Sequence, residues 1–300
     1  MQLAACDWRM IDYQTHQIEA AIHSGQKAAR PFHVLAWSDD PDLQLRTAQT
    51  YCKSLYPASD ELGSIRSDYG HAKLKIGYYS ADFHNHATAV LMAELFESHD
   101  GTKFEIYGFS FGPNVDDDMR KRVAGAFTQF IDVSRLSDAE VAQLSRELEI
   151  DIAIDLKGYT HDCRTGIYSY RCAPIQVNYL GYPGTMGAPY MDYILADHTL
   201  IPPALERHYS EKVIRLPHSY QVNDSKRSIS DRVFTKQELG LPEEGFVFCC
   251  FNNNYKILPG TFDCWMRLLN AVDGSVLWLL ADNPTVVQNL QEEARRRGCL

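Results

Sequence analysis

Two histidines follow the first apolar segment that has the composition of a β-strand, residues 74–83. His84 and His86 flank Asn85 in "SADFHNHATA", and apolar residues at helical spacing begin directly after them. Two histidines at this spacing can bind a metal ion, and an imidazole at a helix start is suited to hydrogen bonding or proton transfer. The simpler alternative is a polar pair that caps the helix, and the pattern leaves these interpretations open.

A lysine follows a later apolar segment, in "FCCFNNNYKILPGTF" (248–262). Lys256 comes after three asparagines, and a helix is expected to begin just past Pro259. The free N–H groups of a helix start favour an anion, and an ammonium group beside them can neutralise charge on a departing diphosphate without moving a proton. A lysine that only covers the surface fits the spacing equally well.

Two more clusters follow predicted strands. The turn "GYPGTMG" (181–187) is rich in glycine, which lets backbone N–H groups approach a ligand, although many such turns only reverse the chain. The segment "LKGYT" places Lys157, Tyr159 and Thr160 at a strand end, where we expect the lysine to be solvated. Asp116–Asp118 are expected to open a helix in solvent rather than to bind a metal ion.

These clusters depend on a regular succession of strands and helices. From residue 74 to about 197, short apolar strands alternate with amphipathic helices, which predicts a parallel sheet that is covered on both faces. The capping box Ser137–Glu140 marks one helix start. In such sheets, ligands bind beyond the carboxyl ends of the strands, where all four clusters lie.

The sequence predicts three regions. Residues 1–70 form a helical connector with a polar linker at 58–72, and residues 71–230 form a Rossmann-like lobe. After a polar interruption at 218–245, residues 231–300 begin a second Rossmann-like lobe with two strands. A doubly wound domain needs five or six strands, so we expect this lobe to be incomplete in the chain.

The composition excludes several classes of protein. The 29 basic and 39 acidic residues give a net charge of −10, which disfavours a nucleic-acid partner. No apolar stretch is long enough to cross a membrane, and the N-terminus lacks the apolar core of a signal peptide. The eight cysteines form no CxxC pair, so we expect small buried side chains in a reducing cytoplasm.

Several motifs together resemble the protein O-linked N-acetylglucosamine transferases, the family that includes SPINDLY-like protein O-fucosyltransferases. The similarity covers roughly residues 70–285, and the segment before it resembles the connector of bacterial members. The matching motifs, in family order, are "KIGYYSADFHNHATAVLM", "DIAIDLKGYTHDCR", "RCAPIQVNYLGYPGTMGAPYMDYILAD", "YSEKVIRLPHSY", "FCCFNNNYKILP" and "SVLWLL".

The resemblance implies a two-lobed GT-B fold and an inverting glycosyltransferase that needs no metal ion or other cofactor. It places His86 in the sugar and acceptor pocket and Lys256 against the diphosphate, as the catalytic residues. The implied donor- and substrate-binding residues are Asn253, Tyr159, Thr160, Gly181, Tyr182, Pro183, Gly184 and Thr185. Animal members carry a histidine where this chain has Asp151, so we assign no role to that position.

The resemblance favours transfer of N-acetylglucosamine from UDP-GlcNAc to Ser/Thr hydroxyls of proteins. Two alternatives remain: a fucosyltransferase that uses GDP-fucose, and a non-catalytic module that binds a protein. The tetratricopeptide repeats and the later donor-binding motif of the family lie outside these 300 residues. We therefore expect a fragment with little activity of its own.

Overall fold

The computed structural model describes residues 2–66 and 69–299, which form two compact units. The large unit is Ala21–Arg227, and the small unit combines the first 20 residues with the segment from Ser228 onward. The region boundaries predicted near residues 70 and 230 remain a prediction.

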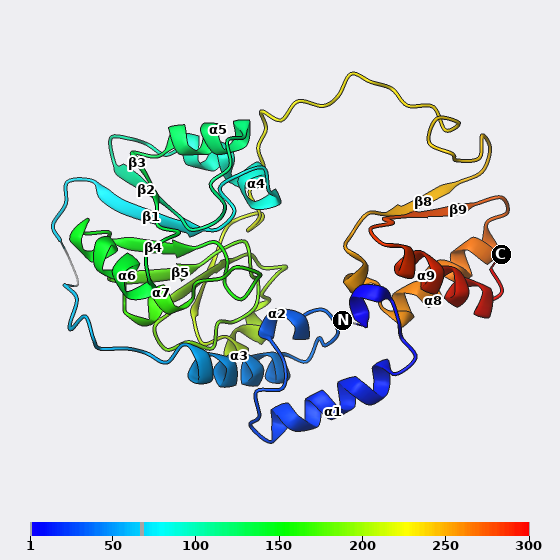
Figure 1. Cartoon of the computed structure of the whole chain (residues 1–300), viewed down its shortest axis with the longest axis horizontal. Coiled ribbons are helices and arrows are strands. Elements are labelled where there is room, and N and C mark those ends of the chain that lie inside the picture. Colours follow the sequence, from blue (N-terminus) through cyan, green and yellow to red (C-terminus); the bar gives the residue numbers. More distant parts are fainter. Residues whose placement is uncertain (1, 67–68, 300) are drawn as a thin grey trace. The chain divides into compact units, whose positions relative to one another are not determined.

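The large unit is built on a seven-stranded parallel sheet in the order β3-β2-β1-β4-β5-β6-β7 (Figure 1). In β1, Tyr78 packs on one side of the sheet and Tyr79 on the other, as the alternation of side chains along a strand requires. The strands are β1 (Leu74–Ser80), β2 (Phe104–Ser110), β3 (Gln129–Asp132), β4 (Ile152–Asp155), β5 (Ile175–Asn178), β6 (Tyr193–Ala196) and β7 (Lys212–Arg215).

Helices cover both faces of this sheet, as the alternating sequence predicts (Figure 1). One core joins α4 and α5 to Ile76 and Ile106, and the other joins α3, α6 and α7 to Tyr79 and Phe109. The helices are α2 (Pro31–Val34), α3 (Pro41–Leu55), α4 (Ala87–Glu97), α5 (Asp118–Ala126), α6 (Asp138–Glu147) and α7 (Gly166–Ser169), with a 3₁₀ helix η2 (Pro203–His208).

Local sequence signals fix several helix ends. Asp40 caps α3 through the backbone N–H groups of Asp42 and Leu43, and Asp117 caps α5 through that of Arg120. The predicted capping box of Ser137 and Glu140 opens α6.

The small unit packs two helices against a two-stranded parallel sheet, β8–β9. Cys6 and Trp8 from the N-terminal segment enter the same core as Phe262 of α8 and Val286 of α9. The elements are η1 (Leu3–Ala5), β8 (Val247–Cys250), η3 (Asn254–Lys256), α8 (Pro259–Ala271), β9 (Val276–Leu279) and α9 (Pro284–Arg296); α1 (Ile11–His23) continues from this unit into the large one.

Three expectations need correction. β7 was not predicted, because its four residues show no apolar run. All eight cysteines are free, but Cys249 and Cys264 are exposed rather than buried. Lys157 is buried rather than solvated.

Within residues 2–66 and 69–299, none of the helices has the length and apolar character that a membrane crossing requires.

Candidate functional site

The strand order places a topological switch point between β1 and β4. From β1 the chain proceeds through β2 to β3 on one side, and it then returns to build β4 to β7 on the other side. Loops leave neighbouring strands in opposite directions at such a point, so that a crevice opens beyond the carboxyl ends. The loop after β1 carries the two histidines, and the loop after β4 carries Lys157.

Lys157 forms a buried ion pair with Asp82 across this switch point. The distance between Lys157 Nζ and Asp82 Oδ2 is 2.7 Å, and the side chains are 6% and 10% exposed. The expectation of a solvated lysine was wrong, because adjacent strands bring a carboxylate from the loop after β1 to the ammonium group. Two charges are tolerated in such a place because they neutralise each other.

His86 caps α4 and contacts the same carboxylate. Its Nδ1 accepts a hydrogen bond from the backbone N–H of Thr88 at 3.2 Å and lies 3.5 Å from Asp82 Oδ2. The Thr88 hydroxyl donates to Asp82 Oδ2 at 3.4 Å. Burial, with Lys157 and His84 nearby, lowers the pKa of His86, although Asp82 raises it. The imidazole is therefore neutral near pH 7, and its side chain is 45% exposed.

The helix α5 fixes the loop after β1. Arg120 is buried and donates from Nη1 to the carbonyl of Phe83 and to the Ser110 hydroxyl, at 3.2 and 3.1 Å. The backbone N–H of Asn85 donates to Asp117 Oδ2 at 3.0 Å. The histidine loop is thus held at both ends. Asp117 is used within the fold, which agrees with the expectation that the acidic run opens a helix.

The loop after β4 folds around Asp155. The Oδ1 of this buried carboxylate accepts hydrogen bonds from the N–H groups of Lys157 and Gly158. Burial raises the pKa of Asp155 to about 6, although these hydrogen bonds lower it. The Thr160 hydroxyl donates a hydrogen bond to the carbonyl of Lys157 at 2.7 Å and so stabilises this turn. Tyr159 is buried, and its hydroxyl donates to the carbonyl of Met186.

The glycine-rich turn after β5 is clamped from two sides. Asn178 Nδ2 donates to the carbonyls of Tyr182 and Gly184 at 3.0 and 3.2 Å. The Thr185 hydroxyl donates to Glu211 Oε2 at 2.7 Å, and both residues are buried. Tyr182 lies in the core. The side chains of this turn serve packing, so a ligand would meet mainly its backbone and the half-buried Pro183.

The small unit holds the lysine that follows β8. Lys256 is exposed at the end of η3, three residues before α8 begins at Pro259 as expected. Its Nζ lies 6.0 Å from the centre of the Tyr255 ring. Asn253 is exposed, whereas Asn254 is buried and donates from Nδ2 to Asp282, which follows β9. This amide bridge joins the ends of the two strands.

Both units match the sequence model of a single family. Residues 61–232 and 228–299 match glycosyl transferase family 41. The chain belongs to this family.

Curated relatives of this family 41 chain are much longer than the region they share with it. A probable UDP-N-acetylglucosamine–peptide N-acetylglucosaminyltransferase SEC of Arabidopsis thaliana is 34% identical over 92% of the chain and 30% of its own length. A UDP-N-acetylglucosamine–peptide N-acetylglucosaminyltransferase of Caenorhabditis elegans is 34% identical over 69% of the chain and 28% of its own length. The chain thus spans about a third or less of these relatives.

A solved structure resembles this family 41 chain along nearly its whole length. A mutant O-GlcNAc transferase of Thermobaculum terrenum aligns with 99% of the chain and 57% of its own, with a TM-score of 0.79 and 26% identity. Together with the parallel sheet, this match confirms the predicted GT-B-type α/β fold.

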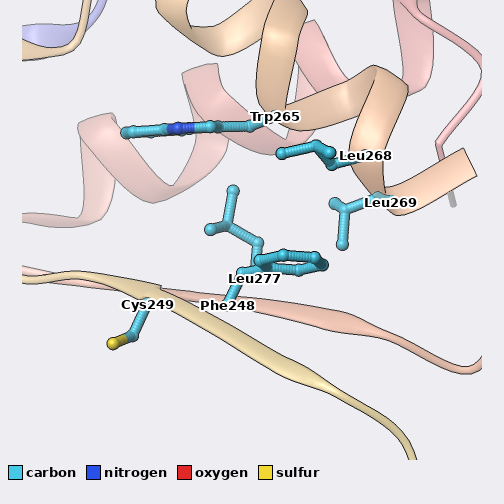
Figure 2. Close-up of a pocket in the computed structure, with 6 residues that line it drawn as sticks. All are labelled: Phe248, Cys249, Trp265, Leu268, Leu269 and Leu277. Atoms are coloured by element: carbon cyan, nitrogen blue, oxygen red, sulfur yellow. The ribbon is translucent and has the colours of Figure 1, made fainter. Parts of the chain in front are cut away.

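The small unit of this family 41 chain also contains an apolar cavity of about 400 Å³, including its open mouth. Figure 2 shows Trp265, Leu268 and Leu269 of α8 on one side of a gap and Phe248 and Leu277 of the two strands on the other side. The Sγ of Cys249 points away from this gap. The lining offers no group suited to proton transfer or to binding phosphate, so we do not include this cavity in the candidate site.

The predicted residues of this family 41 chain fall into two sets, which belong to different units. In the large unit, His86, Tyr159, Thr160 and the turn Gly181–Thr185 all follow the carboxyl ends of β1, β4 and β5. In the small unit, Asn253 and Lys256 follow β8. Their catalytic and binding roles remain predictions.

Three polar residues organise the large-unit set: the sequence analysis missed Asp82 and Glu211, and it noted Lys157 only as a solvated lysine. Asp82 and Lys157 meet below His86, and Glu211 holds the turn at Thr185. Asp82 and Lys157 each lie at the end of an apolar strand, which was the available signal. Glu211 lies in "YSEKVIR" with no local sign of burial.

Among the described residues, no group of three or more His, Cys, Asp and Glu side chains is arranged to bind a metal ion. His84 and His86 lie with their ring centres 5.7 Å apart.

Proposed function

We propose that the chain is part of an inverting glycosyltransferase that moves N-acetylglucosamine from UDP-GlcNAc to serine and threonine hydroxyls of proteins. The observation that carries this proposal is the 34% identity over 92% of the chain with a relative named for that activity. The polar residues at the strand ends of both units add chemical support.

The proposed reaction is a direct displacement. An acceptor hydroxyl oxygen attacks the anomeric carbon and forms a new bond from the face opposite the leaving group, while the bond from this carbon to the diphosphate breaks. The electron pair of the broken bond leaves with UDP, and the hydroxyl proton is released to solvent. The Lys256 ammonium and the free N–H groups at the start of α8 stabilise the negative charge of the departing nucleotide. We propose no metal ion in this step, because an ammonium group and helix N–H groups supply the positive charge.

The roles in the large unit concern substrate oxygens. The half-exposed imidazole of His86 orients an oxygen of the acceptor or the sugar, and the backbone of Gly181–Thr185 and the residue Thr160 contact the donor. Tyr159 is buried and supports this part of the large unit from within. In the small unit, the exposed amide of Asn253 contacts the donor. We further propose that the enzyme acts in the cytoplasm, where its eight cysteines stay free, and that associated tetratricopeptide repeats recruit the protein acceptors.

Donor choice tests the proposal. Purified full-length protein is incubated with acceptor protein and either UDP-GlcNAc or GDP-fucose, and modified serine and threonine residues are identified by mass spectrometry. We expect HexNAc on the acceptor with UDP-GlcNAc alone, together with a rise in melting temperature on adding UDP.

Each other result decides against the proposal. Deoxyhexose transfer from GDP-fucose would make the protein a fucosyltransferase. Acceptor binding without transfer from either donor would make it a non-catalytic module.

A further inference from the structure

Three polar groups surround one carboxylate oxygen of Asp82. Asp82 Oδ2 lies 2.7 Å from Lys157 Nζ, 3.4 Å from the Thr88 hydroxyl and 3.5 Å from His86 Nδ1. Two of these partners come from the loop and helix after β1, and Lys157 comes from the loop after β4. The oxygen thus connects the two loops that border the switch point.

A buried ion pair stabilises a fold less efficiently than apolar side chains do. Removing two charges from water is unfavourable, and apolar residues of similar volume often give equal or greater stability. The position therefore indicates a use for the charges beyond packing. The half-exposed His86 ring lies 3.5 Å from Asp82 and also interacts electrostatically with Lys157.

The hydrogen bond from Thr88 decides which ring nitrogen of His86 carries the proton. A backbone N–H can only donate, so Nδ1, which accepts from it at 3.2 Å, has a free electron pair. A neutral imidazole with a free Nδ1 carries its proton on Nε2. That nitrogen lies on the ring edge away from Thr88 N–H and presents a hydrogen-bond donor.

Lys157 keeps the Nδ1 atom of His86 unprotonated. Without the ammonium group, the Asp82 carboxylate would be left uncompensated 3.5 Å from Nδ1 and would draw a proton onto it. The resulting imidazolium could no longer accept from Thr88 N–H. The other charged groups around this loop are His84 on the loop itself and, from α5, Asp117 and Arg120, which bind its backbone.

We propose that Asp82 and Lys157 are positioning residues that hold His86 as a neutral imidazole protonated on Nε2, so that His86 donates a hydrogen bond to a substrate oxygen and does not act as the general base. Only the identity of that oxygen, in the acceptor or the sugar, rests on the proposed function. The state of the ring is a property of the large unit.

The test is ¹⁵N NMR of the 300-residue chain with labelled histidine. The shifts of the two ring nitrogens distinguish the two neutral tautomers and the cation, and His86→Gln identifies the signals among the eleven histidines. The shifts are followed against pH in wild type, Lys157→Met, Asp82→Asn and the double variant. Lys103→Met removes a lysine that is 72% exposed and serves as the control.

We expect a wild-type ring protonated on Nε2, with a pKa lower than that of an ordinary histidine. Lys157→Met should raise the pKa of His86 by about one unit, and Asp82→Asn should lower it. The double variant should return close to wild type, and the control should change nothing. A role in packing alone would not produce shifts of opposite sign.

The proposal is overturned if folded Lys157→Met leaves the pKa and the tautomer of His86 unchanged, or if the wild-type ring carries its proton on Nδ1. If Lys157→Met does not fold, Asp82→Asn decides: a lower pKa supports the proposal, and an unchanged or higher one overturns it. The measurement uses no sugar nucleotide, so failure to transfer N-acetylglucosamine would refute the proposed function and leave the inferred tautomer of His86, and its control by Asp82 and Lys157, standing.

Discussion

The buried carboxylate of Glu211 accepts a hydrogen bond from the hydroxyl of Thr185 at 2.7 Å and another from the backbone N–H of Met186. Burial raises the pKa of Glu211, while both hydrogen bonds lower it. The residue before β7 thus fixes the end of the glycine-rich turn after β5.

We predict that Glu211→Ala lowers the free energy of unfolding by about 2–4 kcal/mol, because the Thr185 hydroxyl and the Met186 N–H lose their buried acceptor. Urea denaturation measures this change. Glu61→Ala, at an exposed glutamate, is the control and should stay within about 0.5 kcal/mol of wild type. A Glu211→Ala chain as stable as wild type would show that the turn does not depend on this carboxylate.

The first residue of the same turn provides a steric test. A methyl group at Gly181 would overlap the carbonyl oxygen of Leu156 on the neighbouring loop. Gly181→Ala should therefore destabilise the chain by about 2 kcal/mol or more, since backbone on both sides must move. Gly125→Ala in α5 meets no atom within 4 Å and should stabilise by about 0.5–1 kcal/mol. Thermal unfolding compares the two, and equal effects would contradict the close approach of the loops.

A histidine remote from the site predicts a dependence of stability on pH. His71 lies between two carboxylates. Its Nδ1 is 3.0 Å from Asp151 Oδ2, and its Nε2 is 3.0 Å from Glu149 Oε2. Hydrogen bonds to Asp151 and then to Glu149 raise the pKa of His71, although burial lowers it. The stabilisation by these pairs is complete below the unfolded pKa of about 6.5 and is lost as the pH rises through the folded pKa.

We expect wild type to be more stable than His71→Gln at a pH below about 6.5. This difference in unfolding free energy should fall by about 0.5–1 kcal/mol as the pH rises through the folded pKa of His71. Urea denaturation at several pH values measures it. His218→Gln, at an exposed histidine, should show no such trend. A difference that is constant with pH would mean that His71 is not charged between its carboxylates.

The leaving-group role of Lys256 predicts a loss of activity without a loss of fold. Lys256→Ala in the full-length protein should reduce transfer from UDP-GlcNAc about 100-fold, because the developing charge on the diphosphate loses an ammonium group. An exposed lysine contributes little to packing, so the melting temperature should be unchanged. Arg267→Ala removes an exposed cation from α8 and is the matched control. Transfer at the wild-type rate in Lys256→Ala would refute the role.

Local pattern alone determined the class of fold. Alternation of strand and helix periods from residue 74 onward predicted a parallel sheet with helices on both faces, and the capping box at Ser137 marked its helix correctly. These properties depend on residues within a few positions of one another. The predicted placement of chemistry at strand ends followed from the same periodicity and a general rule for open sheets.

Only the tertiary structure decided the electrostatics of the switch point. Asp82 and Lys157 are 75 residues apart, and nothing in either local sequence marks the other as its partner. The strand order brings β1 beside β4, and burial then makes a lysine that looks solvated in the sequence into one half of an ion pair. The interaction of a charge depends on the distance to its counter-charge through the folded protein, and that distance is set by topology rather than by spacing along the chain.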